Sequence, residues 1–374
     1  MIVHSCSRSV NRFFEDPLKQ DAETMITFET MLRVLVAHKP PTFVLENVMG
    51  TKSSSQQVSS CFTVPRASFL DHERQLRMRR VNKADEQDPD ACAPDLSKYK
   101  CPLDYCLDAL QKNLPGYTLA VVEIDSHPLP EERKRVWILG SSSVAFSADA
   151  WKMEVLALEQ QQLPKHHLSS FFKLYGQQAG ATMDVDADKD SRKQPNLWDA
   201  EKKYSAAYAA AVEKAVQAKR LSDDFKPPPR HERPSAKMGK HLTAWMQANC
   251  DVYSAILLQQ QREIEEQMPS IPRAPFPVAD VMQSVSRGHL SLSGHWGTLC
   301  TSSKLMHMDT FQLMPGRGML AMLGNTVENH VHLGLSESEL ASLAGNSMSF
   351  TQLSRVLLPL VAHRRSILTQ PPRA

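Results

Sequence analysis

Two segments of the 374-residue chain carry side chains suited to nucleophilic and acid–base chemistry. Cys6 stands alone near the N-terminus, and its thiolate would be a strong nucleophile, although a lone cysteine is more often an ordinary thiol. Glu46 and Asn47 follow the apolar run 42–45, which suits a short buried strand. We expect the Glu46 carboxylate to face a cleft at the end of that strand, with helix capping or pairing with an arginine as the alternatives.

A third segment offers paired guanidinium groups. Arg133 and Arg135 lie directly before the apolar run 136–139. Alternation along the extended chain places both side chains on one face at the mouth of the strand, where two guanidinium groups could hold an anion or a carbonyl oxygen. The alternative is a charged strand edge that discourages aggregation. This segment therefore predicts either a binding site for an oxygen-bearing group or a protected edge.

The elements that position these residues are predicted from apolar spacing. Apolar residues at helical intervals predict a helix near 22–39, and Pro40-Pro41 ends it before the strand at 42–45. The further predicted helices and strands are a helix at 103–113, strands at 118–124 and 135–139, and helices at 198–221, 241–268, 336–343 and 350–364. Helices interleaved with apolar strands indicate an α/β fold.

Composition excludes several classes of protein. Lys and Arg total 43 against 41 Asp and Glu, so any nucleic-acid contact must come from a local patch. No apolar run approaches the roughly 20 residues of a membrane helix, and the polar N-terminus does not resemble a secretory signal. The 7 cysteines indicate reduced intracellular thiols rather than a disulfide framework. Three of them, at positions 92, 101 and 106, lack a paired C-x-x-C, which favours ordinary thiols over a zinc site.

The middle of the chain is irregular in composition. Residues 51–97 are rich in Ser, Arg and Asp and predict a long surface segment. Residues 176–195 form a polar linker whose DVDADKD lacks the Gly and Glu of a calcium loop. Between Glu201 and Lys240 there are 10 Lys and Arg and 5 Asp and Glu, a local net charge of +5. A solvated helical face and a phosphate-contacting surface explain this charge equally well.

Taken together, these segments resemble the cytosine-5 DNA methyltransferase family. HSCSRSVNRFFEDP stands where the family has its catalytic P-C-Q, and PPTFVLENVMG contains its E-N-V motif. EERKR at 131–135 is similar to the Q-x-R-x-R motif, and LAGNSM at 343–348 is similar to the closing G-N motif. Between them, the segments QSVSRGHLSLSGHWGTLCTSS and GRGMLAMLG resemble the motif that braces a target-recognition domain.

The resemblance implies a mechanism and roles for individual residues. Cys6 would add to C6 of cytosine and make C5 reactive, while Glu46 protonates N3. Asn47 would shape the site, and Arg135, with Arg133 beside it, would hold the base oxygen O2. The target base would be flipped out of the nucleic-acid duplex, which makes DNA the expected partner.

The resemblance also implies a cofactor and an architecture. The methyl donor would be S-adenosylmethionine, with Asn346 and Ser347 closing its pocket and no metal required. The expected fold is a partial Rossmann-like methyltransferase core with a helical or irregular target-recognition insert. Residues 1–140 would form the catalytic portion with a flexible insert at 51–97, residues 141–279 the target-recognition insert, and residues 280–374 the bracing and closing motifs. On local chemistry alone, Gly345 fits a helix C-cap.

Departures from the family pattern leave alternatives open. Only five residues precede Cys6, so the donor-binding F-x-G-x-G-G motif is missing and the chain is expected to be N-terminally truncated. Glu131 replaces the usual Gln, and Leu323 stands where the bracing motif has Gln. The alternatives are a catalytically silent DNA-binding or partner-binding remnant and a tRNA cytosine-5 methyltransferase. The expected location is intracellular and nuclear.

Overall fold

The computed structural model divides the chain into two compact units. It describes residues 2–4, 23–48, 99, 101–161, 163–178, 197–238, 242–267, 276–325 and 334–369. The first unit comprises residues 1–124, 134–157 and 359–374, and the second comprises residues 125–133 and 158–358. Cys6 and the predicted flexible insert at 51–97 lie outside the described residues. The three-part division based on the resemblance stays a prediction.

Four strands form the sheet of the first unit within the described residues. They are β1 (Ile2–His4), β2 (Thr42–Val48), β3 (Thr118–Ile124) and β4 (Arg135–Ser141), in the spatial order β1-β2-β4-β3. β1 is parallel to β2, whereas β4 is antiparallel to both β2 and β3. The carboxyl ends of β1, β2 and β3 and the amino end of β4 therefore share one edge of the sheet.

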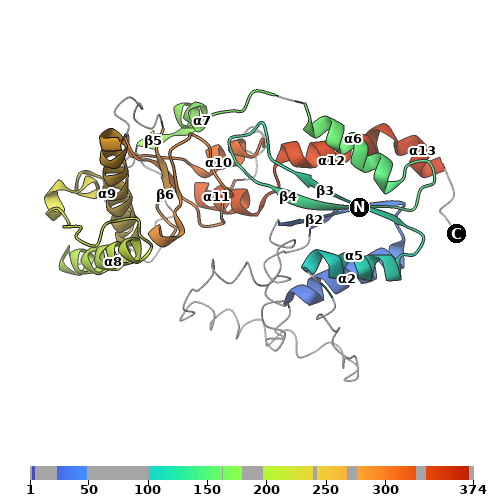
Figure 1. Ribbon diagram of the computed structural model, residues 1–374, viewed down its shortest axis with the longest axis horizontal. Coiled ribbons are helices and arrows are strands. Elements are labelled where there is room, and N and C mark those ends of the chain that lie inside the picture. The colour runs from blue at the N-terminus through green and yellow to red at the C-terminus, as the bar shows by residue number, and fades with distance from the viewer. Residues whose placement is uncertain are drawn as a thin grey trace, which may run out of the picture. The chain divides into compact units, whose positions relative to one another are not determined.

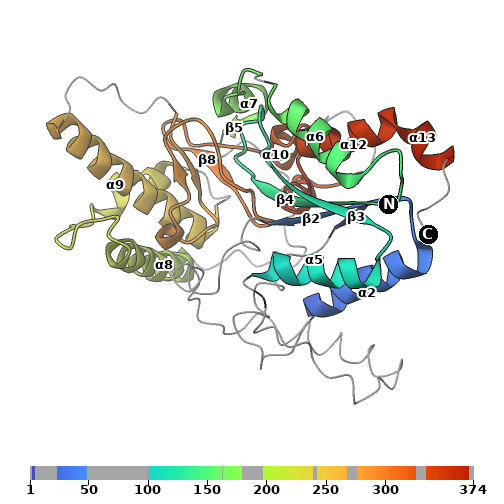
Figure 2. The same cartoon turned by 45° about the vertical axis from the view of Figure 1, so that its right-hand side comes forward.

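Helices cover both faces of this sheet (Figure 1). α2 (Glu23–His38) and α5 (Pro102–Asn113) pack on one face, and their buried side chains form one core with Phe43, Leu45, Val136 and Ile138 of the strands. α6 (Ala148–Glu159) and α13 (Arg364–Thr369) lie on the opposite face, as Figure 2 also shows. This arrangement confirms the α/β fold class predicted from the alternation of helices and apolar strands.

Close packing between the two central strands explains one sequence choice. Every residue of β4 is buried, as expected for a strand covered on both faces. A Cβ atom at Gly140 would lie 2.2 Å from the ring of Phe43, its partner in β2, so this position accommodates only glycine. The glycine lets the Phe43 ring lie across the neighbouring strand.

The second unit combines helices with a small antiparallel sheet. Its helices are α7 (Leu168–Tyr175), α8 (Leu197–Gln217), α9 (Ala244–Gln267), α10 (Gly316–Met322), α11 (Glu337–Asn346) and α12 (Phe350–Ala362), the last of which continues into the first unit. Its strands are β5 (Gln177–Gln178), β6 (Val278–Asp280), β7 (Leu290–Ser291), β8 (Leu305–His307) and β9 (Gln312–Leu313), in the order β5-β9-β8-β6-β7. The predicted helices near 198–221, 241–268, 336–343 and 350–364 are all present.

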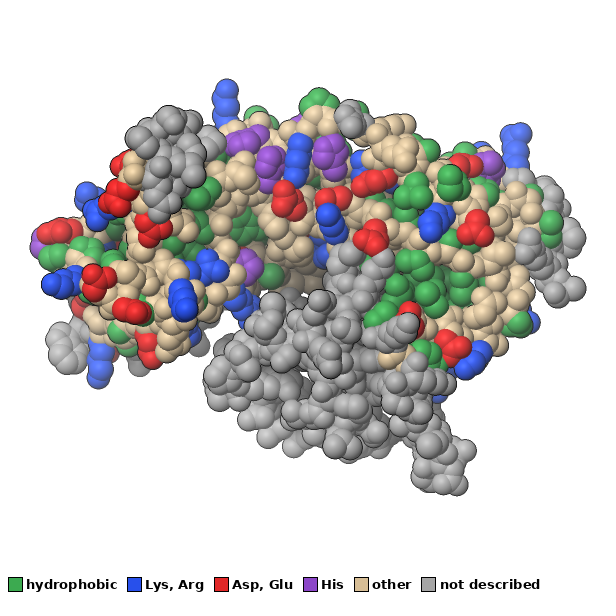
Figure 3. Space-filling view, in the orientation of Figure 1, with side chains coloured by type: hydrophobic (Ala, Val, Ile, Leu, Met, Phe, Trp, Pro, Cys, Tyr) green, Lys and Arg blue, Asp and Glu red, His purple; other side chains and the backbone are tan. Residues whose placement is uncertain are grey.

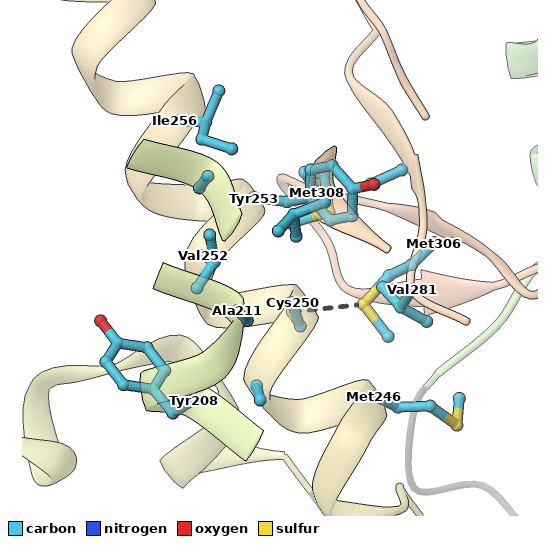
Figure 4. Close-up of a cluster of buried hydrophobic side chains, with 14 of the residues drawn as sticks. Tyr208, Ala211, Met246, Cys250, Val252, Tyr253, Ile256, Val281, Met306 and Met308 are labelled. Atoms are coloured by element: carbon cyan, nitrogen blue, oxygen red, sulfur yellow. Dashed lines mark hydrogen bonds between the residues drawn. The ribbon is translucent and has the colours of Figure 1, made fainter. Parts of the chain in front are cut away.

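The long helices α8 and α9 share one apolar core with the sheet of the second unit (Figure 4). Ala211 from α8, Tyr253 from α9 and Met306 from β8 are buried in it. Cys250 Sγ lies 3.5 Å from Met306 Sδ and is inaccessible to solvent. This burial explains the apolar face of each helix and assigns Cys250 a packing role.

Two further features bear on the sequence-based expectations. Gly176 ends α7, and the next two residues form β5, so the predicted linker 176–195 begins with structured residues. The remainder of that linker lies outside the described residues. Within the part of the chain that the structure describes, no helix is long and apolar enough to cross a membrane.

Candidate active site

Glu46 and Arg135 form a buried ion pair at the shared edge of the first unit's sheet. Glu46 lies in β2 and pairs in register with His4 of β1 and Trp137 of β4. Arg135 begins β4, two residues before Trp137, so it is a diagonal neighbour of Glu46 across the antiparallel pair. Arg135 Nε lies 2.7 Å from Glu46 Oε1, and only 6% and 3% of the two residues are exposed.

The alternation of side chains along β4 decides on which face of the sheet Glu46 and Arg135 lie. Val136 and Ile138 contribute to the core beneath α2 and α5. Arg135 therefore projects from the opposite face, together with Glu46 of the neighbouring strand. In such a buried setting neither charge is stable without the other, so the pair holds both side chains in place. Glu46 lies within the last three residues of β2, and it pairs with an arginine, which is one of the alternatives that the sequence left open. The expectation that its carboxylate faces a cleft stays a prediction.

The other residues predicted for this edge are described only in part. Cys6 lies outside the described residues, and β1 ends at His4, two residues earlier in the sequence. For Asn47 the structure describes the backbone, which is paired with Val136 in β4. The roles of Cys6 and Asn47 therefore remain predictions.

Arg133 has a different partner from Arg135. It precedes β4 and belongs to the second unit, whereas Arg135 begins β4, as the predicted strand 135–139 does. The Nη1 atom of Arg133 lies 3.4 Å from Oε1 of Glu131, and 5% of the residue is exposed. Arg133 does not continue the sheet because Glu131 binds its side chain and the Ser126 hydroxyl binds its backbone N–H, both within the second unit.

Glu131 is the principal site residue that sequence reasoning missed. Its side chain is completely buried, and its Oε1 atom also accepts a hydrogen bond of 3.1 Å from the backbone N–H of Leu299. The backbone of Glu131 forms an isolated β-bridge with that of Trp296, and the Trp296 N–H donates a 2.8 Å hydrogen bond to the carbonyl of Pro130. The sequence offered one indication of this role: Glu131 stands where the family has Gln. A carboxylate that is buried needs a charged partner, which here is Arg133.

The Gly345–Ser347 segment is built differently from the expected cap. α11 continues to Asn346, so Gly345 lies inside its last turn, and the helix is capped by Ser347. A Cβ atom at Gly345 would lie 2.2 Å from the backbone nitrogen of Thr301 and 2.3 Å from the carbonyl carbon of Cys300. The predicted C-cap role for Gly345 is therefore wrong: glycine stands here because another backbone crosses the helix.

Asn346 and Ser347 retain polar groups that suit contact with a ligand. Asn346 is exposed at the end of α11. Ser347 is half-buried, and its hydroxyl donates a 2.7 Å hydrogen bond to the carbonyl of Leu343, which leaves its oxygen able to accept another. Both side chains have polar atoms available for a ligand, and their contact with S-adenosylmethionine stays a prediction. The space beside Gly345 is filled by the backbone of Cys300 and Thr301.

Arginine residues of the basic segment 201–240 partly serve the packing of the second unit. The guanidinium carbon of Arg230 lies 3.8 Å from the ring centre of Tyr204, and that of Arg233 lies 3.7 Å from the ring centre of Tyr208. Asp251 accepts a hydrogen bond from the Tyr204 hydroxyl in the same cluster. On the face seen in Figure 3, Lys and Arg side chains are interspersed with Asp and Glu. These contacts favour a solvated, internally paired surface over a uniform phosphate-binding patch.

Metal-binding side chains do not gather in the described part of the chain. There, no group of three or more His, Cys, Asp or Glu side chains is placed to hold a metal ion. Cys92 lies outside the described residues. Cys106 is buried in α5, and burial raises the pKa of its thiol to about 12, which disfavours the thiolate that a metal requires.

Comparisons with known proteins give only distant likenesses. No family model matches the chain, and no curated protein matches it. Among solved structures, the chain is similar to the Dnmt2 methyltransferase of S. pombe, with 11% identity, a TM-score of 0.36, and coverage of 96% of this chain and 77% of that one. It is also similar to the Entamoeba histolytica methyltransferase EhMeth, with 10% identity, a TM-score of 0.34 and the same two coverages. TM-scores this low do not define a shared fold, so the function is argued from the residues.

Proposed function

We propose that this protein transfers a methyl group to C5 of a flipped-out cytosine in DNA. The observation that carries the proposal is the buried pair of Glu46 and Arg135, 2.7 Å apart at the edge where β1, β2 and β3 end. Open α/β sheets bind their ligands at this kind of edge. A carboxyl group and a guanidinium held side by side match the N3 and O2 atoms of a cytosine ring, which lie next to each other.

The position of Cys6 in the sequence supports the same reaction. β1 ends at His4, which is aligned with Glu46, and Cys6 follows two residues later in the sequence. A nucleophile beside Glu46 could attack C6 of a base whose N3 contacts the carboxyl group. The proposal therefore requires the thiolate of Cys6 as the nucleophile.

Each residue has a defined part in the proposed reaction. The Cys6 thiolate forms a bond to C6 while Glu46, which takes up a proton from solvent as the base binds, passes that proton to N3, so the π electron pair of the C5–C6 bond moves toward C5. Arg135 orients the Glu46 carboxyl group and binds O2, and Asn47 shapes the site. After methylation, loss of the C5 proton to a base and cleavage of the C6–S bond regenerate the thiolate, and the N3 proton returns to the Glu46 carboxylate.

S-adenosylmethionine, when bound, supplies an electrophilic methyl group for C5. Asn346 and Ser347 would contact it through their amide and hydroxyl groups. Both residues lie beside Gly345, whose close contact with the backbone of Cys300 and Thr301 fixes the end of α11. Replacing them should therefore weaken donor binding without altering the pair of Glu46 and Arg135.

Transfer of a radiolabelled methyl group tests the proposal. The wild type, Glu46→Gln and the control Glu123→Gln would each be incubated with labelled S-adenosylmethionine and either duplex DNA or tRNA. Glu123 lies exposed on β3 and serves as a matched carboxylate outside the site. We expect label on DNA with the wild type and the control, and a loss of about 100-fold or more with Glu46→Gln, the range of general acid–base catalysis. Label on tRNA alone would assign an RNA substrate, and label on neither would overturn the enzymatic function.

A further inference from the structure

Trp137 lies directly across from Glu46 on the neighbouring strand of the first unit's sheet. The two residues are register partners in the antiparallel pair of β2 and β4, and Arg135 precedes Trp137 by two residues. Alternation along β4 places Trp137 on the same face as Arg135, opposite the face that packs beneath α2 and α5. Directly opposed residues of such a pair have Cβ atoms about 4.5–5.5 Å apart. Trp137 is therefore a neighbour of both members of the ion pair.

The buried residues around the ion pair on this face are apolar. Besides Trp137, they are Val44 on β2, Ala120, Val122 and Ile124 on β3, and Leu139 on β4. The Trp137 side chain is completely buried and is among the largest of the fully buried side chains. Water therefore does not reach the ion pair from the side that Trp137 occupies.

The indole N–H of Trp137 indicates which property of the side chain matters here. Within the described part of the chain, Trp137 Nε1 is buried and has no hydrogen-bond partner. A buried donor without an acceptor is unfavourable, and a smaller apolar residue would avoid that cost. The volume of the ring is thus what distinguishes tryptophan from such a residue at this position.

We propose that Trp137 is a positioning residue for Glu46: its indole forms one side of the space that holds the carboxyl group against Arg135. This inference rests on the proposed function and adds a residue to it that no sequence motif indicated. Trp137 is too deeply buried to contact the base, so it acts through Glu46. A shift of about 1 Å in a group that acts on the reacting base is sufficient to lower turnover about 100-fold.

Variants of Trp137 that differ in the size and shape of the side chain test this role. Trp137→Leu removes the ring, and Trp137→Met, whose flexible side chain fills gaps, remains informative if Trp137→Leu does not fold. We expect kcat to fall about 10- to 100-fold in both, with KM for DNA and for the donor within about twofold. Trp137→Phe loses no hydrogen bond and keeps a ring beside Glu46, so it should retain most of the turnover.

Trp151 provides a matched control. It is also completely buried and lies on α6 within the first unit. Its ring centre is 6.1 Å from that of Phe146, whose carbonyl accepts a 2.6 Å hydrogen bond from Ser141 Oγ at the other end of β4. Trp151→Leu removes the same volume from the same unit, so it should lose stability to a similar extent while kcat stays within about twofold of the wild type.

A double variant distinguishes positioning from general damage. If Trp137 acts through Glu46, then Trp137→Leu combined with Glu46→Gln should be no slower than Glu46→Gln alone, because the two losses share one cause. Fully multiplicative losses in the double variant would overturn the proposal. So would unchanged kcat in Trp137→Leu, an equal loss of kcat in Trp151→Leu, or a Trp137→Phe variant as slow as Trp137→Leu.

Unfolding measurements keep this test separate from the proposed function. A wild type without methyl transfer would overturn that function and leave the relationship between Trp137 and Glu46 to be decided by urea denaturation. The losses of stability in Trp137→Leu and Glu46→Gln should then not add, because the two side chains are neighbours, whereas those in Trp151→Leu and Glu46→Gln should add. Additive losses for Trp137 and Glu46 would overturn the positioning role.

Discussion

Glu46 and Arg135 lie on neighbouring antiparallel strands, offset by two residues, with Oε1 and Nε 2.7 Å apart. Neither residue is more than 6% exposed. The two charges were therefore removed from water together, and each depends on the other for its compensation. The same geometry presents a carboxyl group and a guanidinium side by side, which is the chemical basis of the proposed contact with cytosine.

Removing one charge of this pair should destabilise the protein as well as inactivate it. In Glu46→Gln the guanidinium of Arg135 remains buried without its anion, which typically costs about 3–5 kcal/mol. The free energy of unfolding, measured by urea denaturation near neutral pH, checks this value. Lys112→Gln is the control, since Lys112 forms an exposed pair with Asp108 in the same unit and its loss should have little effect. Equal effects of the two variants would show that Glu46 and Arg135 are not electrostatically coupled.

A comparison of two adjacent glutamates tests the buried role of Glu131. Glu131→Gln should lower the free energy of unfolding by about 1–3 kcal/mol, because Arg133 loses its charged partner while the hydrogen bond from Leu299 can persist. Glu132→Gln removes the partly exposed pair with Lys165 and should cost less than about 1 kcal/mol. Thermal or urea unfolding of both variants measures the difference. A larger cost for Glu132→Gln would contradict the assigned network.

The sequence indicated the position of Glu46 but not the buried contacts of Glu131, and the difference has a physical reason. The strand end at Glu46 was readable because an apolar run precedes it, and the fold class followed from local periodicity. The partner of a buried charge depends on which strands become neighbours, and β2 and β4 are 87 residues apart when counted from Val48 to Arg135. Glu131 was visible only as a departure from a motif. Nothing in the sequence predicted a role for Gln352 at the start of α12, because its hydrogen bond to the carbonyl of Arg133 joins residues that are distant in the sequence.

Gly345 illustrates the same limit and provides a further prediction. Within a helix, Gly→Ala normally stabilises by up to about 1 kcal/mol. Here the new Cβ atom would lie 2.2 Å from the backbone of Thr301, so we expect Gly345→Ala to destabilise the protein by about 1–3 kcal/mol. Gly297→Ala is the matched control, because a Cβ atom there meets nothing within 4 Å. Melting temperatures of both variants give the readout, and a stabilised Gly345→Ala would refute the crossing of the two backbones.

Stability should depend on pH through His307. Its ring is stacked on Phe276 at 4.1 Å, and burial lowers its pKa below the ordinary 6.5, while Asp309 opposes the shift. As the pH falls below 6.5, the unfolded chain takes up a proton before the folded protein does, so this contribution to stability is complete above 6.5 and is lost on acidification.

The variant His307→Phe isolates this contribution. It keeps an aromatic ring against Phe276 and removes the titration, so the wild type should lose stability relative to the variant between about pH 7 and pH 5. His231→Phe is the control, because 80% of the His231 side chain is exposed. Urea unfolding at each pH provides the free energies. A difference between wild type and His307→Phe that does not change with pH would refute the assignment.

The most direct test of the account is covalent trapping of the nucleophile. A DNA duplex with 5-fluorocytosine would be incubated with the protein and S-adenosylmethionine, and the products analysed by intact mass and peptide mapping. Fluorine in place of the C5 hydrogen prevents the final proton loss, so the bond between Cys6 and C6 of the base should persist. The account predicts an adduct of DNA at Cys6 in the wild type and none in Cys6→Ser. An adduct that survives Cys6→Ser, or no adduct with a wild type that methylates ordinary DNA, would contradict it.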